Sequence, residues 1–412
     1  MFKIILKTAY LNLWRRKSRT FILIVMISFG LAAMIFTQGL YEGMMSQMID
    51  DALRTSSGDF MISKEGHYKS QLLSDYIYDT EPVISALKKN NNVAHFVTRV
   101  KNEGMVSSAK YSQGAEILGV NLEQEQYFIN YKKPLRQGRL ELNENKKEAI
   151  IGQDLADKLK VKIGRKIVLT GQALDKELVA GAFRVVGIIR TNNPEIDEMS
   201  VLIRQKHMQE LFKMNGHISE VSVLVKDKKQ AKQTESTIKA YLTKNSSQKF
   251  EVLGWEELYA LLAMMKSMFV YFVYISYFIV FLAVAVGFFN ILLISILERV
   301  KEYGILLAVG TSFSIVKKMI YLEALIVGMF GFIFGSFFGA LLLIYSKFWG
   351  IDLSNFATGL NKMGMASIMY AEIHFGYFVL AFVVVLLTSY LSAIIPVWKL
   401  KKLKPVQAIR FV

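Results

Sequence analysis

Residues 267–297 read SMFVYFVYISYFIVFLAVAVGFFNILLISIL and contain no charged side chain. A helix of about 20 apolar residues crosses the hydrocarbon core of a bilayer, because a helix satisfies its own backbone hydrogen bonds in lipid. The stretch is about ten residues longer than that requirement. We therefore expect a membrane span that either is tilted or projects beyond the lipid.

Three further stretches of the chain have the same character. Residues 20–40 and 375–398 carry no charge, and residues 319–346 carry only Glu323. The 412-residue chain is 53% hydrophobic, and the excess over an ordinary domain is concentrated in these stretches. The sequence thus predicts four transmembrane helices, at residues 20–40, 266–297, 319–346 and 375–398.

The charges beside the spans predict their orientation. Residues 1–19, which read as a basic amphipathic helix, residues 298–318 and the tail 399–412 each carry an excess of Lys and Arg. Residues 41–265 instead hold 32 Lys or Arg and 29 Asp or Glu. Positive charge beside spans marks the cytoplasmic side. We expect both termini and segment 298–318 in the cytoplasm, and residues 41–265 with the short loop 347–374 outside.

The net charge of +16 does not indicate a nucleic-acid partner, because the basic clusters lie beside the spans. Residues 41–265 alternate strand-like runs such as KEAIIG at 147–152 with helical runs such as KKQAKQTESTIKAYLTKN at 228–245. The chain contains no cysteine, so this region needs its own hydrophobic core. The predicted fold is a membrane protein with four transmembrane helices and a large α+β extracytoplasmic domain inserted between spans 1 and 2.

Searches for catalytic and metal-binding motifs find none. The chain has no H-E-x-x-H, G-x-S-x-G or G-x-x-x-x-G-K-[ST] sequence. The five histidines are scattered along the chain: His67, His95, His207, His217 and His374. We therefore expect no catalytic residue, no metal, no directly bound cofactor and no ATP hydrolysis by this chain.

Segment 298–318, ERVKEYGILLAVGTSFSIVKK, lies between the second and third spans. On a helical wheel, one side carries charges and the other carries Val300, Tyr303, Gly304 and Leu307. After Gly304 apolar residues also occupy the charged side. A segment that is apolar all round must be covered on both sides, which predicts that its own spans cover one side and a partner protein the other. The alternative is a tight loop against the inner leaflet.

Residues 298–312, ERVKEYGILLAVGTS, resemble the E-R-x-x-E-x-G-I-L-x-A-x-G-x-S signature of FtsX-like ABC transporter permeases. Glu323 with the glycines that follow it resembles the family's third span, and KPVQAIR at 404–410 is similar to its closing P-x-x-A-L-R. AIIGQDLA at 149–156 and FRVVGI at 183–188 resemble the MacB-like periplasmic core domain. NPEID at 193–197 and GDFMI at 58–62 are similar to the lipoprotein-releasing LolC/LolE branch.

The resemblance implies a permease in a bacterial inner membrane that extracts lipoproteins for transfer to the outer membrane. Its implied partners are a dimeric ABC ATPase that uses ATP and Mg²⁺, a second permease copy or paralogue, the lipoprotein and membrane lipids. Segment 298–318 would be the coupling helix that docks on the ATPase. The coupling residues by this resemblance are Glu298, Arg299, Glu302, Gly304, Ile305, Leu307, Ala308 and Gly310.

Two other functions remain open from the sequence. A MacB-like efflux permease would export peptides or drugs, and an FtsX- or Bce-like permease would signal and transport nothing. A periplasmic chaperone or adaptor is a further candidate partner. However, residues 171–181, GQALDKELVAG, are short and lack proline, unlike the loop with which LolC-type subunits hook a chaperone.

Two further sets of candidate residues lie in or beside the spans. In the lipoprotein-release family the first and second spans frame a cavity that opens to the bilayer, so the resemblance implies a substrate cavity here. Met and aromatic side chains suit varied acyl chains, and the candidates to line this cavity are Met34, Phe36, Met264, Met265, Phe269, Phe272 and Phe278. Gly331, Gly335 and Gly339 have G-x-x-x-G spacing, which allows close helix packing either between two subunits or, as we favour, within one. Glu323 is expected to form an ion pair with Lys317 or Lys318.

Overall fold

The computed structural model describes residues 2–15, 17–55, 57–128, 135–191, 193–362 and 364–401. The chain divides into two compact units. The membrane unit comprises Met1–Met45, Lys266–Leu353 and Ile368–Val412, and the α+β unit comprises Ser46–Met265 and Ser354–Ser367. The motif at 404–410 lies outside the described residues.

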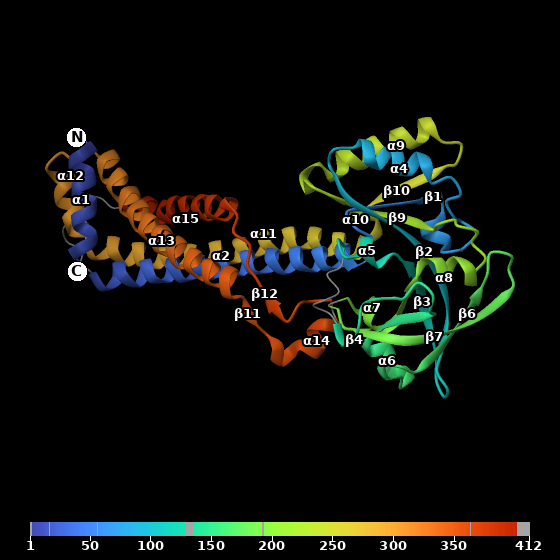
Figure 1. Cartoon of the computed structure of the whole chain (residues 1–412). Helices are drawn as coiled ribbons and strands as arrows, with labels where there is room; N and C mark the ends of the chain where they lie inside the picture. The colour runs from blue at the N-terminus through green and yellow to red at the C-terminus, as the bar shows by residue number, and fades with distance from the viewer. Residues whose placement is uncertain are drawn as a thin grey trace. The chain divides into compact units, whose positions relative to one another are not determined.

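Among the described residues, four helices are long and apolar enough to cross a membrane (Figure 1). They are α2 (Lys17–Thr55), α11 (Ala260–Glu298), α13 (Phe313–Trp349) and α15 (Phe375–Lys401). α2 and α11 have 39 residues each, so each is about 58 Å long, roughly twice the hydrocarbon thickness. α2 therefore continues well past its predicted span of 20–40, whereas α11 exceeds its predicted span of 266–297 by only six residues at its start and one at its end. The predicted fold class is confirmed.

The membrane unit packs around α2. Buried side chains from α2, α11, α13 and α15 form one cluster that includes Ile27, Phe288, Val327 and Val385. Two shorter helices, α1 (Phe2–Arg15) and α12 (Val300–Ala308), lie together at one end of the unit (Figure 1). At the other end, β11 (Ile351–Asp352) and β12 (Ile368–Met369) pair antiparallel.

The three glycines of α13 face α2 of the same chain. A Cβ atom on Gly331 would lie 2.5 Å from the side chain of Ile27, and one on Gly335 would lie 2.9 Å from the backbone oxygen of Ser28. A Cβ on Gly339 would lie 3.1 Å from Ile35. The glycine spacing thus serves packing within one chain, the favoured alternative.

The α+β unit contains a ten-stranded mixed sheet, counted over the described residues, in the order β10-β1-β9-β2-β3-β8-β5-β7-β4, with β6 pairing β2 and β7. The strands are β1 (Phe60–Lys64), β2 (Val93–Ser107), β3 (Ser112–Val120), β4 (Leu135–Gly138), β5 (Glu148–Gly152), β6 (Lys166–Gln172), β7 (Leu178–Ile189), β8 (Ser200–Arg204), β9 (Glu220–Val225) and β10 (Phe250–Gly254). The helices are α3 (His67–Ser70), α4 (Glu81–Lys89), α5 (Leu122–Glu125), α6 (Gln153–Leu159), α7 (Pro194–Met199), α8 (Gln205–Leu211), η1 (Lys228–Gln230), α9 (Ala231–Asn245), α10 (Trp255–Leu258), η2 (Ser354–Phe356) and α14 (Ala357–Lys362).

The sequence predicts two separate strands here, AHFVTRV at 94–100 and GMVSSA at 104–109, but the structure has the single long strand β2 in their place. The intervening residues look like a turn, but long-range contacts keep the backbone extended. The side chain of Asn102 donates a hydrogen bond to the carbonyl of Gln172 at 3.1 Å, and Gly104 pairs with Gly171 of β6. The main core of the unit lies between this sheet and its helices, with Ile62, Leu155 and Phe212 among its buried side chains.

Candidate coupling site

The segment between α11 and α13 folds as the helix α12. Val300, Tyr303 and Gly304 are its buried residues. Tyr303 packs in a cluster with Ile5 and Ala9 of α1, with Val316, Met319 and Ile320 of α13, and with Val397 and Leu400 of α15. Gly310 has φ +99°, a left-handed conformation that suits glycine and turns the chain toward α13. Three helices of the membrane unit thus cover one face of α12.

The opposite side of the segment is exposed, and after Gly304 it is apolar through the end of α12 to Val309. Ile305 is 54% exposed, Leu306 39% and Val309 82%. The residues predicted to couple therefore divide between the two faces. Gly304 and Leu307 belong to the covered side, whereas Ile305 and Ala308 are exposed.

A polar network ties α12 to the rest of the membrane unit through Arg299. Its guanidinium donates to Glu302 at 3.0 Å and to Glu323 of α13 at 3.1 Å. The Arg299 side chain is 14% exposed and that of Glu323 is 7% exposed. Asn12 of α1 also donates to Glu323, at 2.7 Å. One carboxylate therefore joins three helices.

The prediction that Glu323 forms an ion pair with Lys317 or Lys318 is wrong. Lys317 and Lys318 lie six and five positions before Glu323, and side chains at these spacings do not share a helix face. Both lysines are exposed and line a cavity of about 340 Å³ with Tyr321 of α13 and Tyr390 of α15. The ion pair is instead made by Arg299, which enters from the end of α11.

Two exposed ion pairs hold the N-terminal helices against the segment. Arg15 contacts Glu302 at 3.2 Å, and Arg19 binds Glu298 through two hydrogen bonds of 2.6 and 2.9 Å. Exposed pairs contribute little each, about 0–1 kcal/mol. The roles of Asn12, Arg15 and Arg19 have no signal in the sequence, because their partners lie far along the chain.

Tyr303 is the largest side chain on the covered face. It is 1% exposed, and the Arg299 guanidinium carbon lies 5.1 Å from its ring centre. Burial raises the pKa of Tyr303, so the phenol stays neutral and stacks with the cation. The buried ring of Tyr303 and the ion pair of Arg299 with Glu323 thus both anchor the N-terminal half of α12.

The residues assigned to a substrate cavity do not share one surface. Met34 is buried, Phe36 packs against the membrane core, and Met264 and Met265 belong to the α+β unit. Phe269 stacks on Tyr41 with ring centres 3.4 Å apart. Phe272 and Phe278 are exposed. Because Phe278 follows Phe269 by nine residues, the two side chains lie on opposite faces of α11.

Two family models match the chain. The MacB-like periplasmic core domain matches residues 20–241, more than half of the chain, and the FtsX-like permease C-terminal domain matches residues 274–405. The chain belongs to the FtsX-like ABC transporter permeases.

Relatives of this permease carry different names. An uncharacterized ABC transporter permease of Methanocaldococcus jannaschii is 25% identical over 82% of this chain and 83% of its own length. The lipoprotein-releasing system transmembrane protein LolC of Neisseria meningitidis is 20% identical over 95% of this chain and 94% of its own. The macrolide export ATP-binding/permease protein MacB of Bordetella avium is 23% identical over 98% of this chain, which spans 59% of that protein. The permease is therefore a multi-pass membrane protein of the MacB, FtsX and LolC family.

Proposed function

We propose that this permease extracts lipoproteins from a bacterial inner membrane for transfer to the outer membrane, driven by a separate dimeric ABC ATPase. The observation that carries the proposal is the exposed apolar face of α12, opposite the face that its own spans cover. In this arrangement α12 and both termini lie in the cytoplasm and the α+β unit lies in the periplasm. ATP and Mg²⁺ are bound by the partner.

A helix with one anchored face and one apolar face suits docking into a groove of another protein. Burying a side chain such as Ile305 or Val309 contributes about 1.5–3 kcal/mol. The anchored face transmits force, because Arg299 and Tyr303 connect α12 to α1, α13 and α15. ATP-driven movement of the docked partner would therefore reach the spans.

The cargo assignment rests on the LolC relative, which aligns over 95% of this chain. It is also supported by α11, the least covered of the four candidate spans, with 24% of its apolar window buried. Exposed aromatic side chains on α11 include Tyr271, Phe272, Tyr274 and Phe278. This surface suits acyl chains of a lipoprotein or a second permease copy.

The docking part is tested by Ile305→Ser and Val309→Ser. Each change should weaken association with the ATPase about ten- to a hundredfold, measured by copurification and by binding of the purified subunits. Leu178→Ser is the matched control, because Leu178 is 81% exposed on β7 of the α+β unit. Unchanged ATPase binding by both α12 variants would refute the docking face.

The cargo part is tested by depleting the permease and measuring how much acylated outer-membrane lipoprotein remains in the inner membrane. We expect accumulation there, which the Leu178→Ser variant should reverse and the α12 variants should not. Normal sorting in the depleted strain would contradict lipoprotein release.

Macrolide export is the second candidate, favoured by the alignment of MacB over 98% of this chain. Under that function, depletion would leave lipoprotein sorting intact and increase the sensitivity of the strain to macrolides. Lipoprotein sorting and macrolide sensitivity, both measured in the depleted strain, therefore distinguish lipoprotein release from macrolide export.

A further inference from the structure

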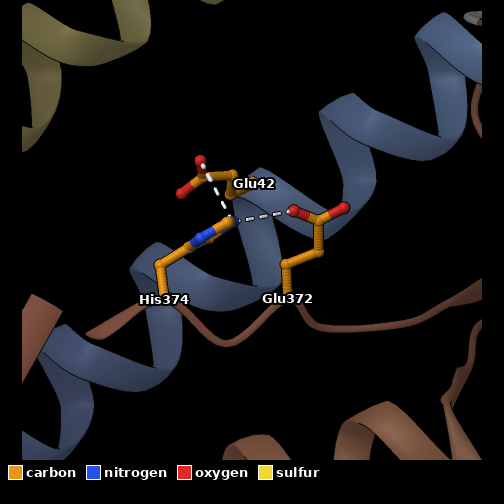
Figure 2. A group of neighbouring side chains, drawn as sticks. All are labelled: Glu42, Glu372 and His374. Carbon is orange, nitrogen blue, oxygen red and sulfur yellow. Dashed lines mark hydrogen bonds and ion pairs between the residues drawn. The ribbon is translucent and has the colours of Figure 1, made fainter. Parts of the chain in front are cut away.

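Three side chains with metal-binding chemistry meet where α2 approaches the start of α15. Glu42 lies on α2, and Glu372 and His374 lie in the segment between β12 and α15. Figure 2 shows the three side chains pointing toward one another. One ligand atom from each lies within 4.8 Å of the other two. All three residues belong to the membrane unit, at the end remote from α12.

The distances match the coordination sphere of a small metal ion. His374 Nε2 lies 3.1 Å from Glu372 Oε2 and 3.7 Å from Glu42 Oε1. Two ligands at about 2.0–2.1 Å from a tetrahedral Zn²⁺ are about 3.3–3.4 Å apart. The two distances lie on either side of that value, so the cluster accepts the ion with small side-chain adjustments.

The charges of the cluster also favour a divalent cation. One imidazole nitrogen faces two carboxylates, and a single N–H group points well at only one of them. Among the described residues, both ion pairs that the glutamates make are with His374. A divalent ion between the three groups neutralises both carboxylates, whereas a protonated histidine supplies a single positive charge.

Neighbouring groups hold the ligands in place. The Tyr377 hydroxyl donates to Glu42 Oε2, which leaves Oε1 directed at His374. The Glu372 amide donates to the carbonyl of Gly39 at 2.9 Å. Gly39 and Gly43, on the same face of α2 as each other, let the 370–372 backbone lie directly on the helix, since a Cβ on Gly39 would lie 2.6 Å from the Glu372 carbonyl oxygen. Such outer contacts tune metal sites.

We propose that Glu42, Glu372 and His374 form a binding site for Zn²⁺, with one coordination position left open. The open position follows from exposure, because the three side chains are 43%, 39% and 54% exposed. One imidazole and two carboxylates suit zinc better than Mg²⁺ or Ca²⁺, which prefer oxygen ligands alone. The bound ion would join α2 to the segment that begins α15.

The test uses the full-length permease in detergent, purified without a histidine tag, stripped with EDTA and titrated with Zn²⁺ against a chromophoric chelator. The wild type should bind one Zn²⁺ per chain at this site. His374→Gln, Glu42→Gln and Glu372→Gln should each weaken it at least about tenfold. His95→Gln and Glu257→Gln are matched controls, because both residues are exposed in the α+β unit and outside the cluster.

Unweakened Zn²⁺ binding by His374→Gln, or absence of stoichiometric binding by the wild type, would overturn the site. Displacement of Zn²⁺ by an equal concentration of Mg²⁺ would overturn the metal assignment. If a variant is not monodisperse, the site can be tested in the wild type alone. Bound Zn²⁺ should protect His374, but not His95, from modification by diethylpyrocarbonate, as mapped by mass spectrometry. Equal modification of His374 with and without Zn²⁺ would refute the proposal.

Discussion

Arg299 and Glu323 form the least exposed ion pair of the membrane unit among the described residues. Removing one partner of such a pair leaves an uncompensated buried charge and costs about 3–5 kcal/mol. Arg299→Met should therefore lower the thermal unfolding temperature of the permease in detergent. Adding Glu323→Met should recover much of the loss, because the double variant buries no unpaired charge.

Additive effects of the two substitutions would contradict direct coupling between Arg299 and Glu323. Lys301→Met is a suitable control, since Lys301 is exposed on the same helix. Its unfolding temperature should remain close to that of the wild type.

Asp197 is a buried carboxyl group in α7 of the α+β unit. It accepts hydrogen bonds from the Thr191 amide at 2.7 Å and from the Thr191 hydroxyl at 3.0 Å. Burial is the main cause that raises the pKa of Asp197 from 3.8 to about 6. Because the folded state holds the proton more tightly than the unfolded state, this group stabilises the fold most below about pH 3.8, and the contribution is lost as pH rises through about 6.

Asp197→Asn should remove that pH dependence, because an amide has no proton to lose and its oxygen still accepts from Thr191. We expect the unfolding temperature of the wild type to fall relative to that of Asp197→Asn between about pH 4 and pH 6. The measurement is thermal unfolding of both proteins in detergent across this range. Parallel pH profiles would show that Asp197 has an ordinary pKa.

Helix packing provides a prediction for α13. A leucine at Gly335 would place its Cβ 2.9 Å from both Leu31 and the backbone oxygen of Ser28, so α2 and α13 would have to separate. Overpacking of this kind costs about 1–3 kcal/mol. Gly335→Leu should lower the unfolding temperature, whereas Gly376→Leu should not, since no atom lies within 4 Å of a Cβ there.

The oligomeric state of the Gly335→Leu variant tests the alternative, that Gly335 packs against a second copy of the permease. If this glycine served contacts between two permease copies, the substitution would dissociate the copies and leave the unfolding temperature unchanged. Size measurement by light scattering, alongside unfolding, therefore distinguishes the two roles.

The elements that the sequence predicts well are those set by local patterns. Uncharged runs locate the four spans, and the helical spacing of Val300, Tyr303 and Gly304 locates the covered face of α12. The same helical wheel places Ile305 and Val309 on the side opposite Val300, Tyr303 and Gly304, where the structure has them exposed. These features depend only on residues a few positions apart.

The features that sequence reasoning missed depend on contacts between distant segments. The hydrogen bond from Asn12 to Glu323 joins residues that are 311 positions apart, so no local sequence pattern predicts it. β2 continues through an apparent turn because β6 pairs with it. In the sequence His374 is far from Glu42. The two side chains are close in the structure because Gly39 and Gly43 let the 370–372 backbone lie against α2. Tertiary proximity of this kind has no local signal in one sequence.

The orientation of the whole chain can be tested with single cysteines, because the natural sequence contains none. Leu178 and Val309 are matched sites, with exposed fractions of 81% and 82%. In spheroplasts, a membrane-impermeant maleimide should label Leu178→Cys directly and Val309→Cys only after lysis. Immediate labelling of Val309→Cys together with protection of Leu178→Cys would reverse the proposed topology.

The contact between Asn12 and Glu323 also has a consequence for the synthesis of the permease. A ribosome adds about 5–20 residues per second, so the 311 positions between these residues correspond to about 15–60 seconds. During that interval Ile5 and Ala9 of α1 have been made, but their partners on α13 have not. Because basic amphipathic helices bind anionic lipid surfaces, we expect the apolar face of α1 to contact lipid before it contacts α13.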